Sequence, residues 1–185
     1  MRIIGGEARS RQIDAPKGMD TRPTLDRVRE TVFDVIQFRV SGAVVLDLFA
    51  GSGAYGLEAL SRGAESALFN DNSTAARRVI ESNIARLGYK ARSELIGLDA
   101  GKALDLLGER GLSFDLIFLD PPYRMNMDGI LDKILSLSLL RQNGIVIAEY
   151  SDIIPVPPEG LSICKVKKAG MTRVAFIRFS EEERS

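Results

Sequence analysis

Two short stretches of the sequence carry residue types that can hold a nucleoside and act on it. Residues 51–56 read GSGAYG, and Asp47 stands shortly before them. Residues 118–123 read FLDPPY, which joins the carboxylate of Asp120 to two prolines and an aromatic ring. Glycine has no Cβ and lets a ligand approach the backbone, whereas a carboxylate and a flat ring can bind a base. The two stretches are therefore the candidate site.

The glycine stretch fits two kinds of nucleoside site. GSGAYG matches the G-x-G-x-x-G pattern of dinucleotide binding, as in a nicotinamide oxidoreductase, but that pattern wants its first glycine directly after a strand. Here the residues DLFA, 47–50, intervene. Asp47 stands where its carboxylate can receive the ammonium of a methionine moiety, which favours S-adenosylmethionine. A third reading is an ordinary turn whose glycines serve only packing.

The DPPY stretch suits methylation of a nucleobase amine. Pro121 and Pro122 remove two backbone donors and stiffen the loop, which fixes the direction of the carbonyl groups. Asp120 and the Pro121 carbonyl can both accept hydrogen bonds from an exocyclic amine, and Tyr123 offers a face for an extruded base. Two acceptors can turn the amine lone pair toward a methyl donor for direct in-line transfer, without a metal or a covalent enzyme intermediate. The alternative is a Pro-Pro turn that only ends a buried strand.

The composition excludes several classes of enzyme. The chain has no histidine and one cysteine, Cys164, so it has no internal disulfide, no Ser-His-Asp triad and no histidine base. A structural zinc site is disfavoured for the same reason. Cys164 lies in a strand-like run and is expected to be a small core residue. No apolar run is long enough to span a bilayer and no signal peptide is evident, so we expect a cytoplasmic protein without membrane contact.

Charge gives a weaker indication of a partner. Lys plus Arg and Asp plus Glu both total 25, so no global basic field points to nucleic acid. The first 29 residues nevertheless hold a local basic surplus, formed by Arg2, Arg9, Arg11, Lys17, Arg22, Arg27 and Arg29. This surplus fits a nucleic-acid contact and a solvated face equally well.

Hydrophobic periodicity and turn residues predict an alternation of strands and helices. Thr24 and Ser73 are expected to begin helices as N-caps, and Gly63 and Gly88 to end them. Helices are expected over 22–38, 53–63, 74–88, 101–110 and 127–140, and strands over 43–49, 66–70, 93–98, 114–120 and 144–150. Residues 161–179 form two strand-like runs around Gly170, and residues 2–18 suggest a short hairpin.

This alternation predicts an α/β fold with a Rossmann-like, mostly parallel seven-stranded sheet. The C-terminal pair of strands is expected as an antiparallel hairpin at the sheet edge, and the N-terminus as a short β-hairpin extension. We divide the chain into an N-terminal extension over 1–22, a main domain over 23–180 and a disordered tail over 181–185.

The chain resembles the Class I S-adenosylmethionine-dependent methyltransferases, and within them the RsmD family, which methylates guanine N2 in bacterial 16S ribosomal RNA. The resemblance spans nearly the whole chain. DPPY alone is shared with DNA adenine-N6 methyltransferases, so the N-terminal RPT followed by DRVRE is the distinctive part. The matching stretches are RIIGGEARSRQ, RPTLDRVRETVFDVI, LDLFAGSGAYGLEALSRGA, DLIFLDPPY and KKAGMTRVAFIRF.

The resemblance implies roles for residues that match the family motifs. Asp120 to Tyr123 would present the target base, as catalytic residues. The implied cofactor residues are Asp47, Gly51, Ser52 and Gly53 on the methionine side, Thr24 and Arg27 at the cofactor carboxylate, and Asp99 with the Ala100 backbone at the adenine. The family usually has an acid at the end of the second strand for the ribose hydroxyls, where this chain has Asn70 followed by Asp71. Either residue can serve, and we favour Asp71.

The resemblance also implies the partner. It implies 16S rRNA within a small-subunit assembly particle as substrate, with guanine 966 as the target. Apart from the resemblance, we expect no metal and favour a monomer. We expect Arg2, Arg9, Arg11 and Arg22 to contact this RNA. A DNA adenine-N6 methyltransferase remains the nearest alternative, although the chain leaves little room for a target-recognition domain. A catalytically silent S-adenosylmethionine- or RNA-binding assembly factor is the other.

Overall fold

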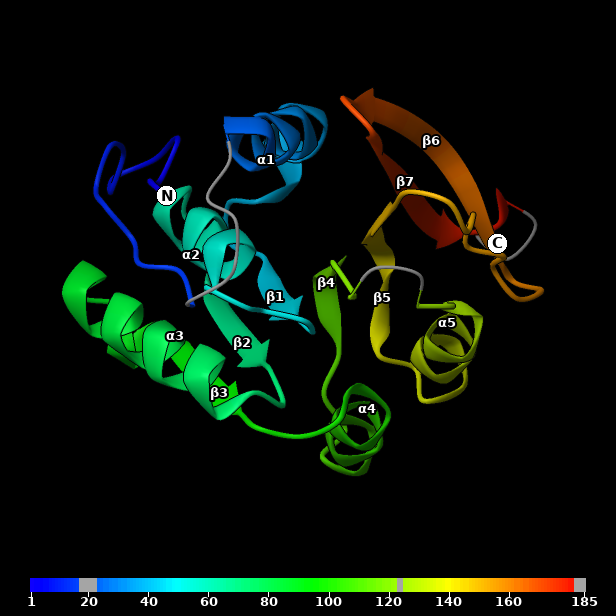
Figure 1. Cartoon of the computed structure of the whole chain (residues 1–185). Coiled ribbons are helices and arrows are strands. Elements are labelled where there is room, and N and C mark those ends of the chain that lie inside the picture. Colours follow the sequence, from blue (N-terminus) through cyan, green and yellow to red (C-terminus); the bar gives the residue numbers. More distant parts are fainter. Residues whose placement is uncertain (17–22, 123–124, 182–185) are drawn as a thin grey trace.

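One seven-stranded sheet runs through the molecule (Figure 1). The computed structural model describes residues 1–16, 23–122 and 125–181, without the side chains of residues 23–25. The strand order is β3-β2-β1-β4-β5-β7-β6. The strands are β1 (Val44–Asp47), β2 (Ser66–Asn70), β3 (Ser93–Ile96), β4 (Phe114–Leu119), β5 (Leu140–Tyr150), β6 (Leu161–Ala169) and β7 (Thr172–Phe179).

Strands β1 to β5 run parallel to one another, and β7 is antiparallel to both β5 and β6. Parallel strands need crossover connections, and each is supplied by a helix of the predicted alternation. The C-terminal hairpin turns around Gly170, which has a φ of 66°. The predicted Rossmann-like α/β fold with its C-terminal hairpin is confirmed.

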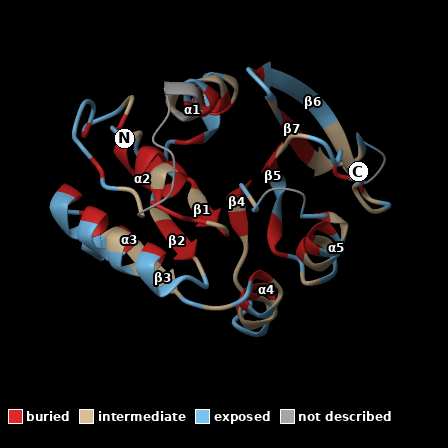
Figure 2. Ribbon diagram, viewed as in Figure 1, coloured by how far each residue is buried: buried red, intermediate tan, exposed pale blue. Residues whose placement is uncertain are grey.

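Five α-helices cover the two faces of the sheet within the described residues (Figure 1). They are α1 (Pro23–Ile36), α2 (Ala54–Ser61), α3 (Thr74–Leu87), α4 (Ala100–Glu109) and α5 (Asp128–Ser136), with short 3-10 turns at η1 (Gln37–Arg39) and η2 (Lys90–Arg92). Helices α1, α2 and α3 pack in one apolar core, and α4 and α5 in the other. Figure 2 shows the buried residues along the central strands and on the helix sides that face them.

The ends of the helices follow local chemistry. The Ser73 hydroxyl accepts a hydrogen bond from the Ala76 N–H, and Gly88 ends the same helix in a left-handed conformation, as predicted. Gly63 follows α2 with a φ of 94°, also as predicted. The predicted N-cap Thr24 is wrong, because α1 already begins at Pro23. Proline is favoured in the first helical position, where its missing N–H would have no partner.

The N-terminal segment folds back on itself less regularly than expected. The expected hairpin is present as one antiparallel bridge between Arg2 and Gln12, flanked by backbone hydrogen bonds such as Ile3 N–H to the Arg11 carbonyl. Ile3, Ala8 and Ile13 are buried in the core that α1, α2 and α3 share. The segment over residues 1–14 is therefore packed into the main domain. The expected tail falls largely on residues 182–185, outside the described residues.

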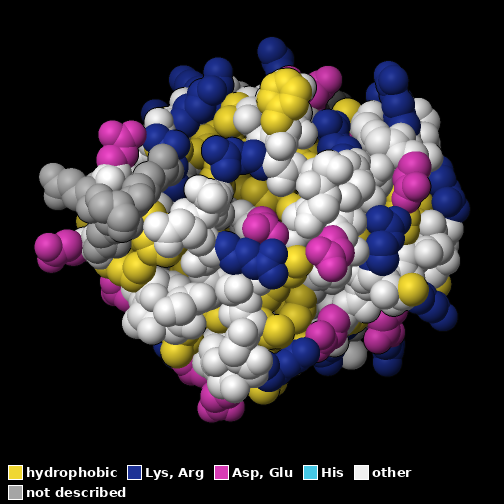
Figure 3. Space-filling view, turned by 180° about the vertical axis from the view of Figure 1, so that it is seen from behind, with side chains coloured by type: hydrophobic (Ala, Val, Ile, Leu, Met, Phe, Trp, Pro, Cys, Tyr) yellow, Lys and Arg dark blue, Asp and Glu magenta, His cyan; other side chains and the backbone are white. Residues whose placement is uncertain are grey.

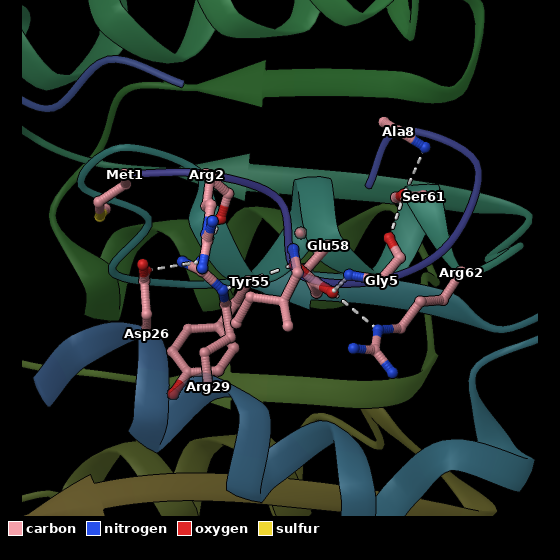
Figure 4. Close-up of polar contacts among 12 residues, drawn as sticks. Met1, Arg2, Gly5, Ala8, Asp26, Arg29, Tyr55, Glu58, Ser61 and Arg62 are labelled. Carbon is pink, nitrogen blue, oxygen red and sulfur yellow. Dashed lines mark hydrogen bonds and ion pairs between the residues drawn. The ribbon is translucent and has the colours of Figure 1, made fainter. Parts of the chain in front are cut away.

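A buried carboxylate holds this segment against α2 (Figure 4). Glu58 is fully buried, and its oxygens accept hydrogen bonds from the N–H groups of Ile4 and Gly5 at 2.8 and 2.7 Å. The guanidinium groups of Arg62 and Arg29 approach the same carboxylate at 2.8 and 3.6 Å. An ionised group buried in this way needs charged or hydrogen-bonding partners, and Glu58 has both.

The structure also bears on the predictions made for Cys164 and for membrane-spanning segments. Cys164 is exposed, so its prediction as a core residue is wrong. It lies in the edge strand β6, where the pairing with β7 shifts between Ile163 and Lys165. A bulge of this kind turns the extra side chain away from the regular alternation. Among the described residues, no helix is long and apolar enough to cross a membrane.

Candidate active site

Acidic residues gather at the carboxyl ends of the first five strands. Because these strands are parallel, their carboxyl ends meet at one edge of the sheet, where α/β proteins bind ligands. The acids at this edge are Asp47, Asp71, Asp99, Asp120 and Glu149. The structure thus brings together four acids that the sequence singled out and adds a fifth, Glu149.

The glycine loop connects β1 to α2. Gly51 has a φ of 55° and its N–H donates to the Asp71 carboxylate at 2.8 Å. Gly53 has a φ of 79° and forms the N-cap of α2, a conformation that glycine adopts without strain. Gly56 has a different role, since a Cβ there would lie 2.3 Å from Cε1 of Phe69 on β2. Two glycines of GSGAYG therefore shape the loop, and the third permits close packing of helix on strand.

Ser52 and the N-terminal segment stabilise this loop. Ser52 is buried, and its carbonyl accepts a hydrogen bond from the Asn83 side chain of α3 at 3.0 Å. The same amide group of Asn83 exchanges hydrogen bonds with the backbone of Asp14. One side chain thus ties the glycine loop to the end of the N-terminal segment.

Asp47 is the most deeply buried of the candidate acids. Only 2% of its surface is exposed, and its Oδ2 accepts a hydrogen bond from the Gly56 N–H at 3.0 Å. Desolvation raises its pKa from 3.8 to about 7, and the nearby charges of Asp120 and Asp71 add to the rise. No Lys or Arg of the described residues lowers this pKa. A cation at this edge of the sheet would be electrostatically favourable.

We expect Asp47→Asn to stabilise the protein at pH 8 by about 3 kcal/mol more than at pH 5. The folded-state pKa of Asp47 is raised, so the stability it contributes is present at low pH and is lost as the pH rises through about 7. Asparagine keeps an oxygen for the Gly56 N–H but does not ionise. Denaturant unfolding at both pH values measures the difference, with the exposed Asp132→Asn as control. Equal stabilisation at the two pH values would contradict it.

Asn70 and Asp71 separate into two roles. Asn70 is 1% exposed, and its amide donates to the Leu48 and Leu98 carbonyls and accepts from the Leu98 N–H. Its side chain thus ties the ends of β1 and β3 together. Asp71 is half-buried and accepts from the N–H groups of Gly51 and Ser73 at 2.8 Å each. Between the two, Asp71 is the one that retains an accessible carboxylate.

The remaining cofactor residues lie in two places. Asp99 is exposed at the N-cap of α4, where its carboxylate accepts from the Gly101 N–H, and Ala100 follows it as the first helical residue. Arg27 is exposed in a surface groove with Arg2 and Arg9, and none of the acids at the strand ends lines that groove. The side chain of Thr24 lies outside the described part of the chain.

A pocket lies at the ends of β4 and β5, with a volume of about 120 Å³. Asp120, Pro121, Pro122 and Glu149 line it, and Thr172 contributes from the start of β7. The carboxylate of Asp120 makes no hydrogen bond with the residues that the structure describes. It is exposed into this concave space but surrounded by protein on most sides, and this desolvation raises its pKa to about 6. Tyr123, the fourth residue predicted for the base, lies outside the described residues.

Glu149 is a site residue that the sequence analysis missed. It is 8% exposed, and it accepts a hydrogen bond from the hydroxyl of Tyr55 in the first turn of α2. The ring of Tyr55 stacks on Phe118 of β4 with 4.8 Å between ring centroids. An acid at the end of the apolar run GIVIAEY, on the strand next to Asp120, was the signal that could have revealed it.

Asp120 and Glu149 influence each other's ionisation. Burial raises the pKa of Glu149 well above its usual value, and the charge of Asp120 raises it further. Two carboxyl groups this close in a poorly solvated pocket do not both ionise readily. Burial therefore disfavours the charged form of both groups, and Asp120 is the one whose carboxyl group has no hydrogen-bond partner among the described residues. Among the described residues, no cluster of acids, Cys or His is arranged to hold a metal ion.

The arginines predicted to contact RNA differ in their surroundings. Arg2 and Arg9 are exposed at the surface groove that Arg27 also lines. Arg11 instead donates from its guanidinium to the carbonyls of Arg86 and Leu87, at the end of α3. A cation in that position stabilises the helix end. Arg11 is also exposed, so its contact with RNA stays a prediction. Arg22 falls outside the described residues.

Comparisons with known proteins agree with this arrangement. The family model "Conserved hypothetical protein 95" matches residues 1–178. The chain is 35% identical over 181 residues to "Putative rRNA methyltransferase YlbH" of Bacillus subtilis, a match that covers 96% of this chain and 98% of that protein. It is also 35% identical over 190 residues to "Ribosomal RNA small subunit methyltransferase D" of Escherichia coli, with coverage of 98% and 90%.

A solved structure gives the same relationship in three dimensions. "Putative methyltransferase yhhF" of Escherichia coli superposes with a TM-score of 0.85 and 31% sequence identity, covering 97% of this chain and 98% of that chain. Sequence and structural similarity therefore extend over the N-terminal segment as well as the sheet. The chain belongs to the Conserved hypothetical protein 95 family, the family of RsmD-type methyltransferases.

Proposed function

We propose that the protein transfers a methyl group from S-adenosylmethionine to the exocyclic N2 amine of a guanine in bacterial 16S rRNA. One observation carries the proposal: the carboxyl groups of Asp120 and Glu149 line the same pocket, at the edge of the sheet where Asp47, Asp71 and Asp99 also lie. The names of the relatives in Escherichia coli and Bacillus subtilis support rRNA as the substrate class. The resemblance to the RsmD family further suggests guanine 966 as the target, and the proposal places the reaction in the cytoplasm, where ribosomes assemble.

The acidic edge fits the charge of this cofactor. S-adenosylmethionine supplies an electrophilic methyl group on a sulfonium, and it carries a second positive charge on its ammonium. Asp47 binds the ammonium and in return is held ionised, because a nearby cation lowers the pKa of a carboxyl group. Asp71 accepts hydrogen bonds from the ribose hydroxyls, and Asp99 from the adenine amine, next to the Ala100 N–H. The assignment of Thr24 and Arg27 to the cofactor carboxylate rests on the family resemblance alone, since Arg27 lines the groove of Arg2 and Arg9.

The two carboxyl groups of the pocket fit guanine better than adenine. Guanine offers an N1–H and an N2 amine side by side as donors, whereas adenine offers one amine beside an acceptor nitrogen. Asp120 and the Pro121 carbonyl accept from the N2 amine, which directs its lone pair toward the methyl group. An oxygen of the Glu149 side-chain carboxyl group accepts a hydrogen bond from the N1–H. Tyr123 stacks on the base, and Pro122 keeps the loop stiff.

The N-terminal segment contributes to RNA binding. Arg2 and Arg9 line one exposed groove, and phosphate contacts of this kind supply much of the affinity for RNA. The substrate in this proposal is 16S rRNA within an assembling small subunit.

Identification of the methylated nucleoside tests the proposal. Purified protein is incubated with labelled S-adenosylmethionine and either unmethylated small subunits, naked 16S rRNA or adenine-containing duplex DNA, and the products are digested and analysed by mass. We expect N2-methylguanosine from the ribosomal substrate. N6-methyladenine from DNA would assign the protein to the alternative methyltransferases. Binding of S-adenosylmethionine without transfer to any substrate would indicate a silent assembly factor.

A further inference from the structure

The tip of the β6–β7 hairpin is a compact basic surface that the proposed function does not use. Residues 167–173 read KKAGMTR and contain three cations and no acid. Lys167, Lys168, Met171 and Arg173 are exposed, and Lys165 continues the basic edge along β6. In Figure 3, Lys and Arg side chains predominate along the upper edge of the molecule, the edge at which α1 and the tip of β6 lie (Figure 1).

The hairpin tip lies at the rim of the pocket that holds Asp120. Thr172 lines that pocket, and it pairs with Ala169 across the turn. Arg173 pairs with Tyr150 at the end of β5 and donates to the carbonyl of Ser151 at 3.0 Å. The tip is therefore attached to the strand end that supplies Glu149.

The surroundings of the pocket explain why cations are needed here. Asp120 and Glu149 line the pocket, with Asp47 at the same edge of the sheet, and any negative charge on these carboxyl groups repels a polyanion. The chain as a whole carries no net charge. A nucleotide whose base enters the pocket keeps its phosphates at the rim. Lysines at the rim offset the repulsion where the phosphates must lie.

Met171 adds an apolar contact at the same place. Its side chain is 82% exposed, beside Gly170 in the turn. Exposed apolar side chains are common singly, but this one stands between the cations Lys168 and Arg173 and next to Thr172, which lines the pocket. Apolar side chains in such positions fill the space that an extruded base leaves, or pack on its neighbour.

We propose that the hairpin tip, residues 167–173, binds the RNA that flanks the target guanine. Lys167 and Lys168 contact phosphates, Met171 packs against a base next to the target, and Arg173 fixes the tip to the end of β5. This inference rests on the proposed function, and it adds a second RNA contact on the side of the pocket away from the N-terminal segment.

Charge reversal tests the lysines. The variant Lys167→Glu/Lys168→Glu is compared with Arg78→Glu/Lys90→Glu, an equal charge change on exposed residues by the opposite sheet edge, at α3 and η2. RNA affinity is measured over a range of salt concentrations. We expect the hairpin variant to lose about 10-fold or more in affinity at low salt and to flatten the logarithmic salt slope by about 1–2, with S-adenosylmethionine binding unchanged. The control should match the wild type.

Met171→Ser tests the apolar contact. We expect it to lower kcat/KM several-fold without changing the salt slope, whereas Met171→Leu should restore activity. Failure of the wild type to methylate 16S rRNA would overturn the proposed function and this inference together. Methylation by the wild type with RNA affinity and salt slope unaltered in the lysine variant would overturn the hairpin proposal alone. If Lys167→Glu/Lys168→Glu abolished binding to anionic vesicles but left RNA binding intact, the tip would be assigned to a membrane surface instead.

Discussion

Asp120→Ala is expected to lower kcat for methyl transfer by about 100-fold to 10,000-fold while S-adenosylmethionine still binds. The residue lines the pocket and makes no hydrogen bond within the described part of the structure, so its removal costs little in folding. What is lost is the acceptor that orients the amine and receives its proton after transfer. Single-turnover kinetics with the rRNA substrate measure the effect, and calorimetric titration measures cofactor binding.

The conservative variant separates hydrogen bonding from proton acceptance. Asparagine can still accept a hydrogen bond from the amine but cannot take its proton, so Asp120→Asn should retain part of the activity that Asp120→Ala loses. In the wild type, activity should fall below about pH 6, because the pKa of Asp120 is about 6 and its protonated form is not an acceptor of the same strength. Asp120→Asn should lack this acid limb.

The control for both variants is Asp132→Ala, an exposed position on α5 outside the pocket. It should leave the rate and its pH dependence unchanged. An equal loss of cofactor binding and activity in Asp120→Ala would show instead that this carboxylate maintains the structure of the site. Since Asp120 and Glu149 titrate together, the acid limb reports on the pair.

Glu58→Ala is expected to lower the free energy of unfolding by about 3–5 kcal/mol. The substitution removes the acceptor for the Ile4 and Gly5 N–H groups, and it leaves the buried guanidinium of Arg29 with fewer partners. An uncompensated buried charge is among the most costly defects in a core. Denaturant unfolding monitors global stability, and hydrogen exchange at Ile4 and Gly5 monitors the N-terminal segment.

Two further variants keep this prediction testable if the alanine variant does not fold. Glu58→Gln preserves shape and one acceptor oxygen, so its loss should be smaller but should still expose the Ile4 or Gly5 amide to exchange. Glu81→Ala, on the exposed side of α3, should change stability by less than about 0.5 kcal/mol. A loss below about 1 kcal/mol for Glu58→Ala would mean that the N-terminal segment does not depend on this carboxylate.

Local chemistry made the fold predictable. Ser73 and Gly88 limit α3 because a hydroxyl cap and a left-handed glycine act through near neighbours in the chain. The apolar runs of β1, β2 and β4 also allowed these strands to be predicted, since a strand covered on both faces needs continuous apolar residues. The motif acids also came together as expected, because parallel strands bring their ends to one edge.

Residues whose roles depend on distant partners were not predictable. The contact of the Arg11 guanidinium with carbonyls at the end of α3 could not be foreseen, because these carbonyls are far from Arg11 in sequence. Glu149 was overlooked because its importance comes from Tyr55 and Asp120, which are far from it in sequence. Glu58 stood unnoticed inside a helix because its hydrogen-bond partners belong to the N-terminal segment. In each case the contact that gives the residue its role joins two segments far apart in the sequence. Hydrophobic periodicity describes each segment by itself and does not show which segments meet.

The position of Tyr55 has a thermodynamic consequence. Tyr55 lies in the first turn of α2, close to the N-cap Gly53, and its hydroxyl donates a hydrogen bond to Glu149 in the pocket that Asp120 also lines. One turn of helix thus connects the loop at one site to a carboxyl group at the other. If a ligand bound at the glycine loop shifts this turn, it changes the binding free energy of a second ligand in the pocket. The ligand in the pocket then changes the binding free energy at the loop by the same amount. Such linkage is reciprocal, so either ligand can report on the other, and Tyr55→Phe is the substitution that would uncouple them.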